Sequence, residues 1–160
     1  MILKGFQISV LTVAMASAPA LAQDADTAKQ DSERSFLFAQ SGEGLTVTEE
    51  TIALVKPFGK TTWVTNRPER DVGQISNERF ASAWDEGENS FAADPPNAVI
   101  TVAGRLSAIV VLTDISVGSD EISYDYELMS GDLGEKSAPT TILIDPSRGP
   151  SGCALTGSCL

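Results

Sequence analysis

Histidine is absent from this 160-residue chain, and its absence removes several kinds of chemistry. Without an imidazole, the chain cannot build a Ser-His-Asp triad and has no histidine ligand for zinc or haem. The sequence also lacks Gly-x-Ser-x-Gly, Ser-x-x-Lys and a glycine-rich phosphate loop. These absences favour a non-enzymatic protein. A carboxylate-dependent hydrolase stays open as a weaker alternative, because acidic residues are plentiful.

Basic residues are scarce. The chain has 11 lysines and arginines against 22 aspartates and glutamates, a net charge of −11. Such a charge disfavours nucleic acid and anionic lipid surfaces as partners, because both repel it. It suits a soluble protein that meets divalent cations or basic partners.

Cysteine occurs twice, at Cys153 and Cys159. Two thiols in an exported protein meet an oxidising compartment, so we expect them to form one disulfide that staples the tail. A redox or metal site would usually need a closer Cys-x-x-Cys pair or more ligands.

The amino terminus has the pattern of a secretory signal peptide. Lys4 precedes an apolar run that is too short to span a bilayer, and Ala20 and Ala22 occupy the small-residue positions of a cleavage site. We therefore expect a signal peptide over residues 1–22 and a periplasmic or extracellular protein. No membrane span is expected in the mature chain.

After the signal peptide, a polar stretch without periodicity predicts a flexible lead-in over residues 23–33. The domain is expected over residues 34–146, followed by the tail at residues 147–160. Short β-branched and apolar runs separated by turn residues predict its strands. The runs are SFLFAQ, LTVT, TIALVK, TTWVT, AVITVAG, LSAIVVLTDISV, EISYDYEL and TILID.

These runs amount to about seven or eight strands, with one short helix after Ser76. The fold class that they favour is mainly β, an antiparallel β-sandwich with a helical insertion. An eight-stranded outer-membrane barrel is the structural rival, but it would need longer strands and aromatic girdles. Two further details are expected: SGEG, at residues 41–44, is a turn, and AVITVAG and LSAIVVLTDISV are central strands buried on both faces.

Three arginines, Arg67, Arg70 and Arg79, form the first candidate site. Guanidinium groups bind carboxylate, phosphate or sulfate, so a proline-stiffened loop before a helix start could hold a small anion or ligand. The alternative is that these arginines pair with Glu69, Asp71, Glu78 or Asp85 and fix the loop. In a chain this acidic, the pairing alternative is favoured.

A second candidate is the run WDEGENS. Asp85, Glu86, Glu88 and Asn89 surround Gly87 and offer oxygen ligands that could hold calcium. The spacing matches no EF-hand loop, and acidic residues are common where helices end. No other cofactor is indicated.

The residues after Asn66 resemble a family of secreted bacterial proteins of unknown function. The family pattern is (D/N)RPxRxxG, then Phe and Trp on a helix, then FxxxPPNA. The matching residues here are Arg67, Pro68, Arg70, Gly73, Phe80, Trp84, Phe91, Pro95, Pro96, Asn97 and Ala98. Asn66 stands where the family often has Asp, so any role of that carboxylate is in doubt. The resemblance implies a secreted single-domain protein and implies no activity.

The sequence therefore predicts an exported, soluble, non-enzymatic β domain that serves as a protein-interaction or envelope-structural module. A small-anion or small-ligand binding protein is the alternative. The expected partner is another envelope protein.

Overall fold

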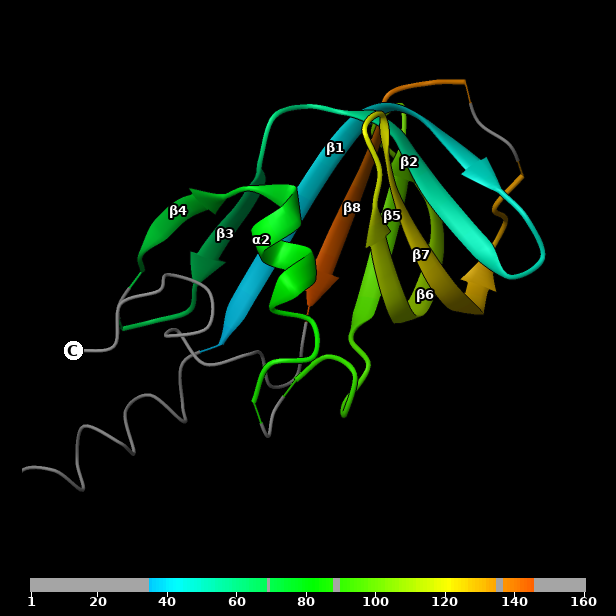
Figure 1. The fold of residues 1–160 in the computed structure, drawn as a ribbon. Helices are drawn as coiled ribbons and strands as arrows, with labels where there is room; N and C mark the ends of the chain where they lie inside the picture. Colours follow the sequence, from blue (N-terminus) through cyan, green and yellow to red (C-terminus); the bar gives the residue numbers. More distant parts are fainter. Residues whose placement is uncertain (1–34, 69, 88–89, 135–136, 146–160) are drawn as a thin grey trace, which may run out of the picture.

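The computed structural model describes residues 35–68, 70–87, 90–134 and 137–145, and these form eight strands and one short helix (Figure 1). The strands are β1 (Phe36–Val47), β2 (Thr51–Pro57), β3 (Thr61–Thr65), β4 (Val72–Ile75), β5 (Asn97–Val102), β6 (Arg105–Val117), β7 (Glu121–Gly131) and β8 (Thr140–Asp145). The helix is α2 (Asn77–Ser82). The prediction of a mainly β fold with one short helix is therefore confirmed.

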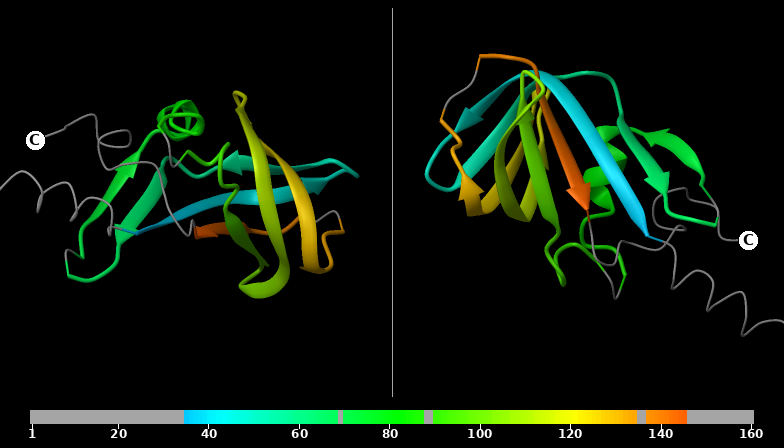
Figure 2. Two further views of the ribbon diagram at one scale, coloured as in Figure 1. Left: turned by 90° about the horizontal axis from the view of Figure 1, so that it is seen from below. Right: turned by 180° about the vertical axis from the view of Figure 1, so that it is seen from behind.

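The strands form a closed barrel, so the predicted sandwich is wrong. All pairings are antiparallel, in the order β2-β7-β6-β5-β8-β1-β3-β4, and β2 also pairs with β1. That extra pairing closes six strands, β1, β2, β7, β6, β5 and β8, into a ring. Strands β3 and β4 extend the same sheet beyond the ring, as the views in Figure 2 show.

Closure depends on the length of β1, which is long enough to pair with two strands along one edge. Its first half pairs with β3, from Phe36 opposite Thr65, and its second half pairs with β2, to Val47 opposite Ile52. Its other edge pairs with β8. The LTVT and TIALVK runs therefore form a hairpin.

The predicted turn at residues 41–44 is wrong, because SGEG lies inside β1. A Cβ on Gly42 would come within 2.6 Å of the Val55 carbonyl oxygen and 2.9 Å of the Leu54 side chain. The glycine therefore permits the close approach of β2, rather than reversing the chain.

The barrel interior is filled by alternate side chains of its strands, together with aromatic side chains from α2 and the loop after it. The Phe38 ring lies 5.0 Å from that of Phe80 and 5.9 Å from that of Phe91, and the Trp84 ring lies 5.9 Å from that of Tyr124. All five side chains are buried. The helix and the loop after it thus supply part of the core.

A chain of buried hydrogen bonds ties the barrel to β3 and α2. The Tyr124 hydroxyl donates to Gln40 Oε1 at 2.6 Å, and Gln40 Nε2 donates to Thr61 Oγ1 at 2.9 Å. Thr61 Oγ1 donates to Asn77 Oδ1 at 2.9 Å, and Asn77 Nδ2 donates to the Gly59 carbonyl at 3.2 Å. Burial raises the pKa of the Tyr124 phenol well above its ordinary value, and the bond to Gln40 opposes that rise.

The apolar residues at alternate positions of EISYDYEL would share one face of a strand, and β7 follows this alternation only at its start. Ile122 and Tyr124 point into the core. Leu128, which lies opposite the buried Val110, is 50% exposed. Among the described residues, no helix is long and apolar enough to cross a membrane.

Candidate functional site

The structure separates the three candidate arginines. Arg67 and Arg70 lie in the loop between β3 and β4, whereas Arg79 lies in α2, at the other end of β4 (Figure 1). Four strand residues span about 13 Å. The predicted three-arginine site is therefore not assembled, and only Arg67 and Arg70 share a loop.

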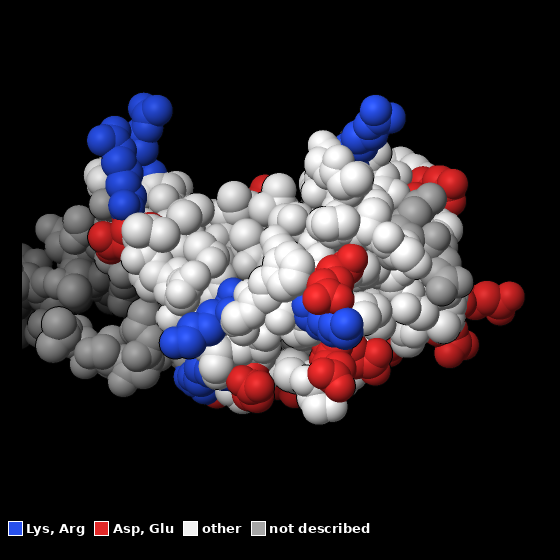
Figure 3. All heavy atoms as spheres, turned by 90° about the horizontal axis from the view of Figure 1, so that it is seen from above, with Lys and Arg blue, Asp and Glu red and all other residues white. Residues whose placement is uncertain are grey.

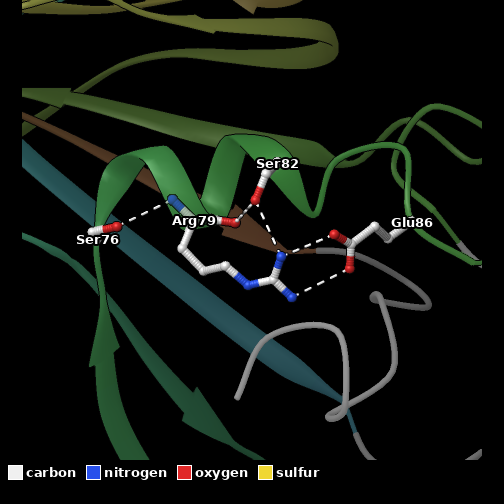
Figure 4. A network of polar contacts seen from close by, with 4 residues as sticks. All are labelled: Ser76, Arg79, Ser82 and Glu86. Carbon is white, nitrogen blue, oxygen red and sulfur yellow. Dashed lines mark hydrogen bonds and ion pairs between the residues drawn. The ribbon is translucent and has the colours of Figure 1, made fainter. Parts of the chain in front are cut away.

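Arg79 is engaged within its own helix segment (Figure 4). Its Nη1 donates to Glu86 Oε1 at 2.9 Å and to Ser82 Oγ at 3.2 Å, and its Nη2 donates to Glu86 Oε2 at 3.3 Å. Its backbone N–H donates to Ser76 Oγ at 3.1 Å, which caps the helix. Arg79 thus follows the pairing alternative, although its partner is Glu86 rather than one of the four acids expected to pair with the arginines.

Arg67 and Arg70 have a different environment. Both are exposed, and neither guanidinium makes an ion pair or hydrogen bond with another residue of the described ranges. The loop itself is held by backbone contacts. The Arg70 N–H donates to the Asn66 carbonyl at 3.1 Å, and the Asp71 N–H donates to Thr65 Oγ1 at 2.8 Å. Both guanidinium groups thus face solvent from a loop that hydrogen bonds hold in place, which we call the pinned loop.

The Arg70 backbone adds to this picture, because its φ is 55°. A left-handed conformation is unfavourable for a residue with a β-carbon, by about 1 kcal/mol or more. The loop holds Arg70 in that conformation despite the cost. Such outliers favour a functional reading of the loop.

The calcium candidate is only partly described. Asp85 and Glu86 follow α2, while Glu88 and Asn89 lie outside the described residues. Both carboxylate oxygens of Glu86 accept from Arg79, and this contact would compete with a cation. Within the described ranges, no three acidic or thiol side chains group as metal ligands. The predicted disulfide between Cys153 and Cys159 also falls outside the described residues, so calcium and disulfide both stay predictions.

Two surface hollows have acidic residues in their lining and could in principle hold a substrate for catalysis by carboxylates. One, of about 360 Å³, lies beside β1 and β2 and has Glu43 in its lining, where Lys56 Nζ pairs with it at 2.9 Å. The other, of about 320 Å³, lies where β1, β3 and β8 meet and has Asp145 in its lining. Each lining has one acidic residue among the described residues, so neither hollow offers the acid pair that glycoside hydrolysis needs.

The feature that sequence reasoning missed is a broad surface without charge, which we call the neutral face. It consists of sixteen outward positions in six neighbouring strands; the outward residues Glu43 of β1 and Asp114 of β6 are charged and lie outside it. The sixteen positions are Ser107, Ile109 and Val111 of β6, Asn97, Val99 and Thr101 of β5, Thr141, Leu143 and Asp145 of β8, Leu37, Ala39 and Ser41 of β1, Thr62 and Val64 of β3, and Val72 and Gln74 of β4. Asp145 is the one charged residue in this set.

The neutral face is continuous because the register aligns it. One row runs through Ile109, Val99, Leu143, Ala39 and Thr62 to Gln74, each opposite the next. In a parallel row, Leu37 lies opposite Val64, and Val64 lies opposite Val72. Figure 2 (right) shows β5, β8, β1 and β3 side by side, with α2 on the far side of the sheet.

This arrangement corrects the prediction that β5 and β6 are buried on both faces. Ala98, Ile100, Ala108 and Val110 face the core, but the outward side chains of these strands are partly or fully exposed. A closed barrel has one layer, so no second sheet covers them. The apolar runs in the sequence were the available signal for this apolar surface. Which of their alternate residues stay exposed is decided by the geometry of the barrel.

Acidic residues lie on the barrel surface beside the neutral face. On the outer side of β6 and β7, Asp114 lies opposite Asp125, and Glu121 and Glu127 are also exposed. Figure 3 shows acidic side chains over the lower and right-hand parts of the surface seen there, and a group of basic side chains at the upper left. The neutral face therefore differs from its surroundings in charge.

In comparisons with known proteins, no family model, no curated protein and no solved structure matches the chain. The resemblance to a family of secreted proteins therefore stays a hypothesis.

Proposed function

We propose that this protein is an exported, non-enzymatic interaction module, and that the neutral face docks onto a partner protein of the cell envelope. The observation that carries the proposal is the pattern of Val99, Ile109 and Leu143. Their strands have apolar residues on both sides, as in strands covered on both faces, yet only one side is covered by the described residues. An exposed, partly apolar surface on a protein whose net charge is −11 is typical of a docking site.

A protein surface fits the neutral face better than a lipid surface does. Its outward side chains are aliphatic residues mixed with threonine and serine, without the Trp and Tyr that anchor proteins at membrane interfaces. The net charge of −11 also repels anionic headgroups. A partner with an uncharged contact surface is therefore the occupant to which the proposal commits.

Position-specific photo-crosslinking tests this proposal. A photoreactive residue is placed at Val99 or Leu143 on the neutral face, and in control variants at Ser123 or Asp125 on the outer side of β7. In cells of the source organism, the neutral-face positions should crosslink to one envelope protein, identified by mass spectrometry, and the controls should not. Equal crosslinking at all four positions, or none, would contradict the proposal. So would binding of the purified protein to neutral phosphatidylcholine vesicles through Val99.

The second candidate is binding of a small anion by Arg67 and Arg70. Its support is the exposure of both guanidinium groups without partners in the described ranges. A rise in melting temperature with phosphate, sulfate or a small carboxylate, lost in Arg67→Ala, would favour it, because a ligand that binds only the folded state stabilises that state. No shift with any of these anions would argue against it.

A further inference from the structure

Strand β4 ends the sheet with an unpaired backbone edge. It pairs with β3 on one side and with no described strand on the other. The Thr65 N–H donates to the Asp71 carbonyl, so the alternation of an antiparallel pair directs the backbone groups of Gly73 and Ile75 toward β3. The N–H and C=O groups of Val72 and Gln74 therefore point away from the sheet, where another strand could bond to them.

The side chains of β4 leave this edge accessible. Natural proteins protect an edge strand by keeping it short, or with charges, proline or a bulge. The strand Val72–Ile75 is short, with four residues, but it contains no charge, proline or bulge, and its pairing with β3 is regular. Val72 is 70% exposed, the highest fraction among the large apolar side chains of the described residues. It is also the end of the row through Leu37 and Val64, so an added strand would continue the neutral face.

Positive charge lies at the start of this edge. Arg67 and Arg70 precede Val72 in the same pinned loop, and both lack partners in the described part of the chain. A segment lying along β4 would pass these guanidinium groups at one end. Carboxylate side chains on that segment would supply the charge-assisted hydrogen bonds that the arginines lack here.

From this geometry we propose that β4 binds an extended segment of the partner protein as an added strand. The segment carries aliphatic side chains at alternate positions, one of which packs beside Val72, and Asp or Glu side chains that pair with Arg67 and Arg70. Main-chain hydrogen bonds to Val72 and Gln74 supply affinity, and the two arginines supply selectivity for acidic segments. This inference rests on the proposed function and names the partner element that the module recognises.

A displayed library of random peptides of about twelve residues, enough to cover β4 and reach Arg67, is the probe. The library is selected on the protein at low ionic strength. Enriched peptides should combine alternating aliphatic or β-branched residues with Asp or Glu. Enrichment of basic peptides, or no enrichment, would overturn the inference.

Two variants then locate the binding of an enriched peptide, measured by fluorescence anisotropy. Gln74→Pro removes an edge N–H without touching the bonds to β3, and proline is accepted on edge strands. It should weaken binding at least tenfold, about the effect of losing 1.4 kcal/mol. Gln74→Ala is the matched control: it loses the side-chain bond to Thr62 but keeps the backbone donor, so it should bind nearly as well as the wild type.

The charge requirement is tested separately. The double change Arg67→Glu with Arg70→Glu should weaken the same peptide about tenfold at low salt and less at high salt, because exposed ion pairs are screened. The control Lys60→Glu with Arg105→Glu makes the same change in net charge at two other exposed positions and should leave binding nearly unchanged. Equal losses in the two double variants would overturn the role of the loop.

The remaining outcomes assign the edge differently or separate the two proposals. A dimer of the purified protein that Gln74→Pro dissociates would give β4 to a second copy of the chain and overturn the inference. Persistent crosslinks from Val99 in the Gln74→Pro variant, without peptide binding by the wild type, would leave the proposed function standing and remove strand addition. If the neutral-face positions give no crosslinks but peptide binding is intact, strand addition at β4 stands and docking through the neutral face is removed.

Discussion

At the residue scale, Tyr124 is the most fully buried titratable group among the described residues. Its hydroxyl is the first donor in the buried chain that reaches α2 through Gln40 and Thr61. Tyr124→Phe leaves Gln40 Oε1 without its partner, and an unsatisfied buried acceptor costs about 1–3 kcal/mol. Urea unfolding at neutral pH should show a loss of that size. A Tyr124→Phe variant as stable as the wild type would mean that this series of buried hydrogen bonds does not contribute to stability.

Tyr124 also predicts a pH dependence. Burial raises the pKa of its phenol in the folded state above the ordinary value of 10.0. The unfolded chain then releases this proton above about pH 10 while the folded chain keeps it, so stability from this group is complete below pH 10 and falls at higher pH, by up to about 1.4 kcal/mol per pH unit. Urea unfolding between pH 9 and 11 should show a shallower fall in Tyr124→Phe than in the wild type, with Tyr126→Phe as the control. Equal slopes in the wild type and Tyr124→Phe would contradict this assignment.

At the element scale, α2 has six residues, so its ends matter more than its length. The Ser76 side chain satisfies the Arg79 N–H in the first turn. Ser76→Ala should lower the free energy of unfolding by about 1 kcal/mol, whereas Ser76→Asp, which keeps an acceptor oxygen, should lower it less. Equilibrium urea unfolding of both variants checks this expectation; equal losses would show that the cap is unimportant.

The same scale shows what the sequence could and could not predict. Local chemistry located the start of the helix after Ser76 and most strand segments, because these depend on neighbouring residues. It failed for SGEG, since the role of Gly42 is set by β2 across the sheet. It also missed β4, whose four residues carry little periodicity of their own.

The candidate site was predictable only in part, for the same reason. Arg67 and Arg70 were found as loop residues, but the pairing of Arg79 with Glu86 depends on how the chain turns after α2. The neutral face joins residues from six strands, and only the register brings them into one surface. The alternation of apolar and polar residues along the sequence does not show whether an outward position is covered by another part of the protein or exposed to solvent.

At the scale of the whole molecule, export remains a prediction that mass spectrometry can check. Protein isolated from the cell envelope of the source organism should begin at Gln23 and should be lighter by two hydrogens than the reduced chain, because Cys153 and Cys159 are expected to pair. Reduction should restore the missing mass. An intact amino terminus on cytoplasmic protein, or free thiols on the exported form, would contradict the respective expectation.

Closure of the barrel has a consequence for when the molecule can fold. The strand that begins the barrel, β1, bonds to the strand that ends it, β8, and Ser41 and Thr141 share a hydrogen bond of 2.8 Å across 100 residues of chain. The ring therefore cannot form until β8 has been synthesised, and pairings so distant in sequence make folding slow. Before β8 is made, neighbouring strands such as β1 and β2, or β6 and β7, can pair as hairpins, but the ring itself stays open. The molecule thus acquires its barrel only after its last strand arrives.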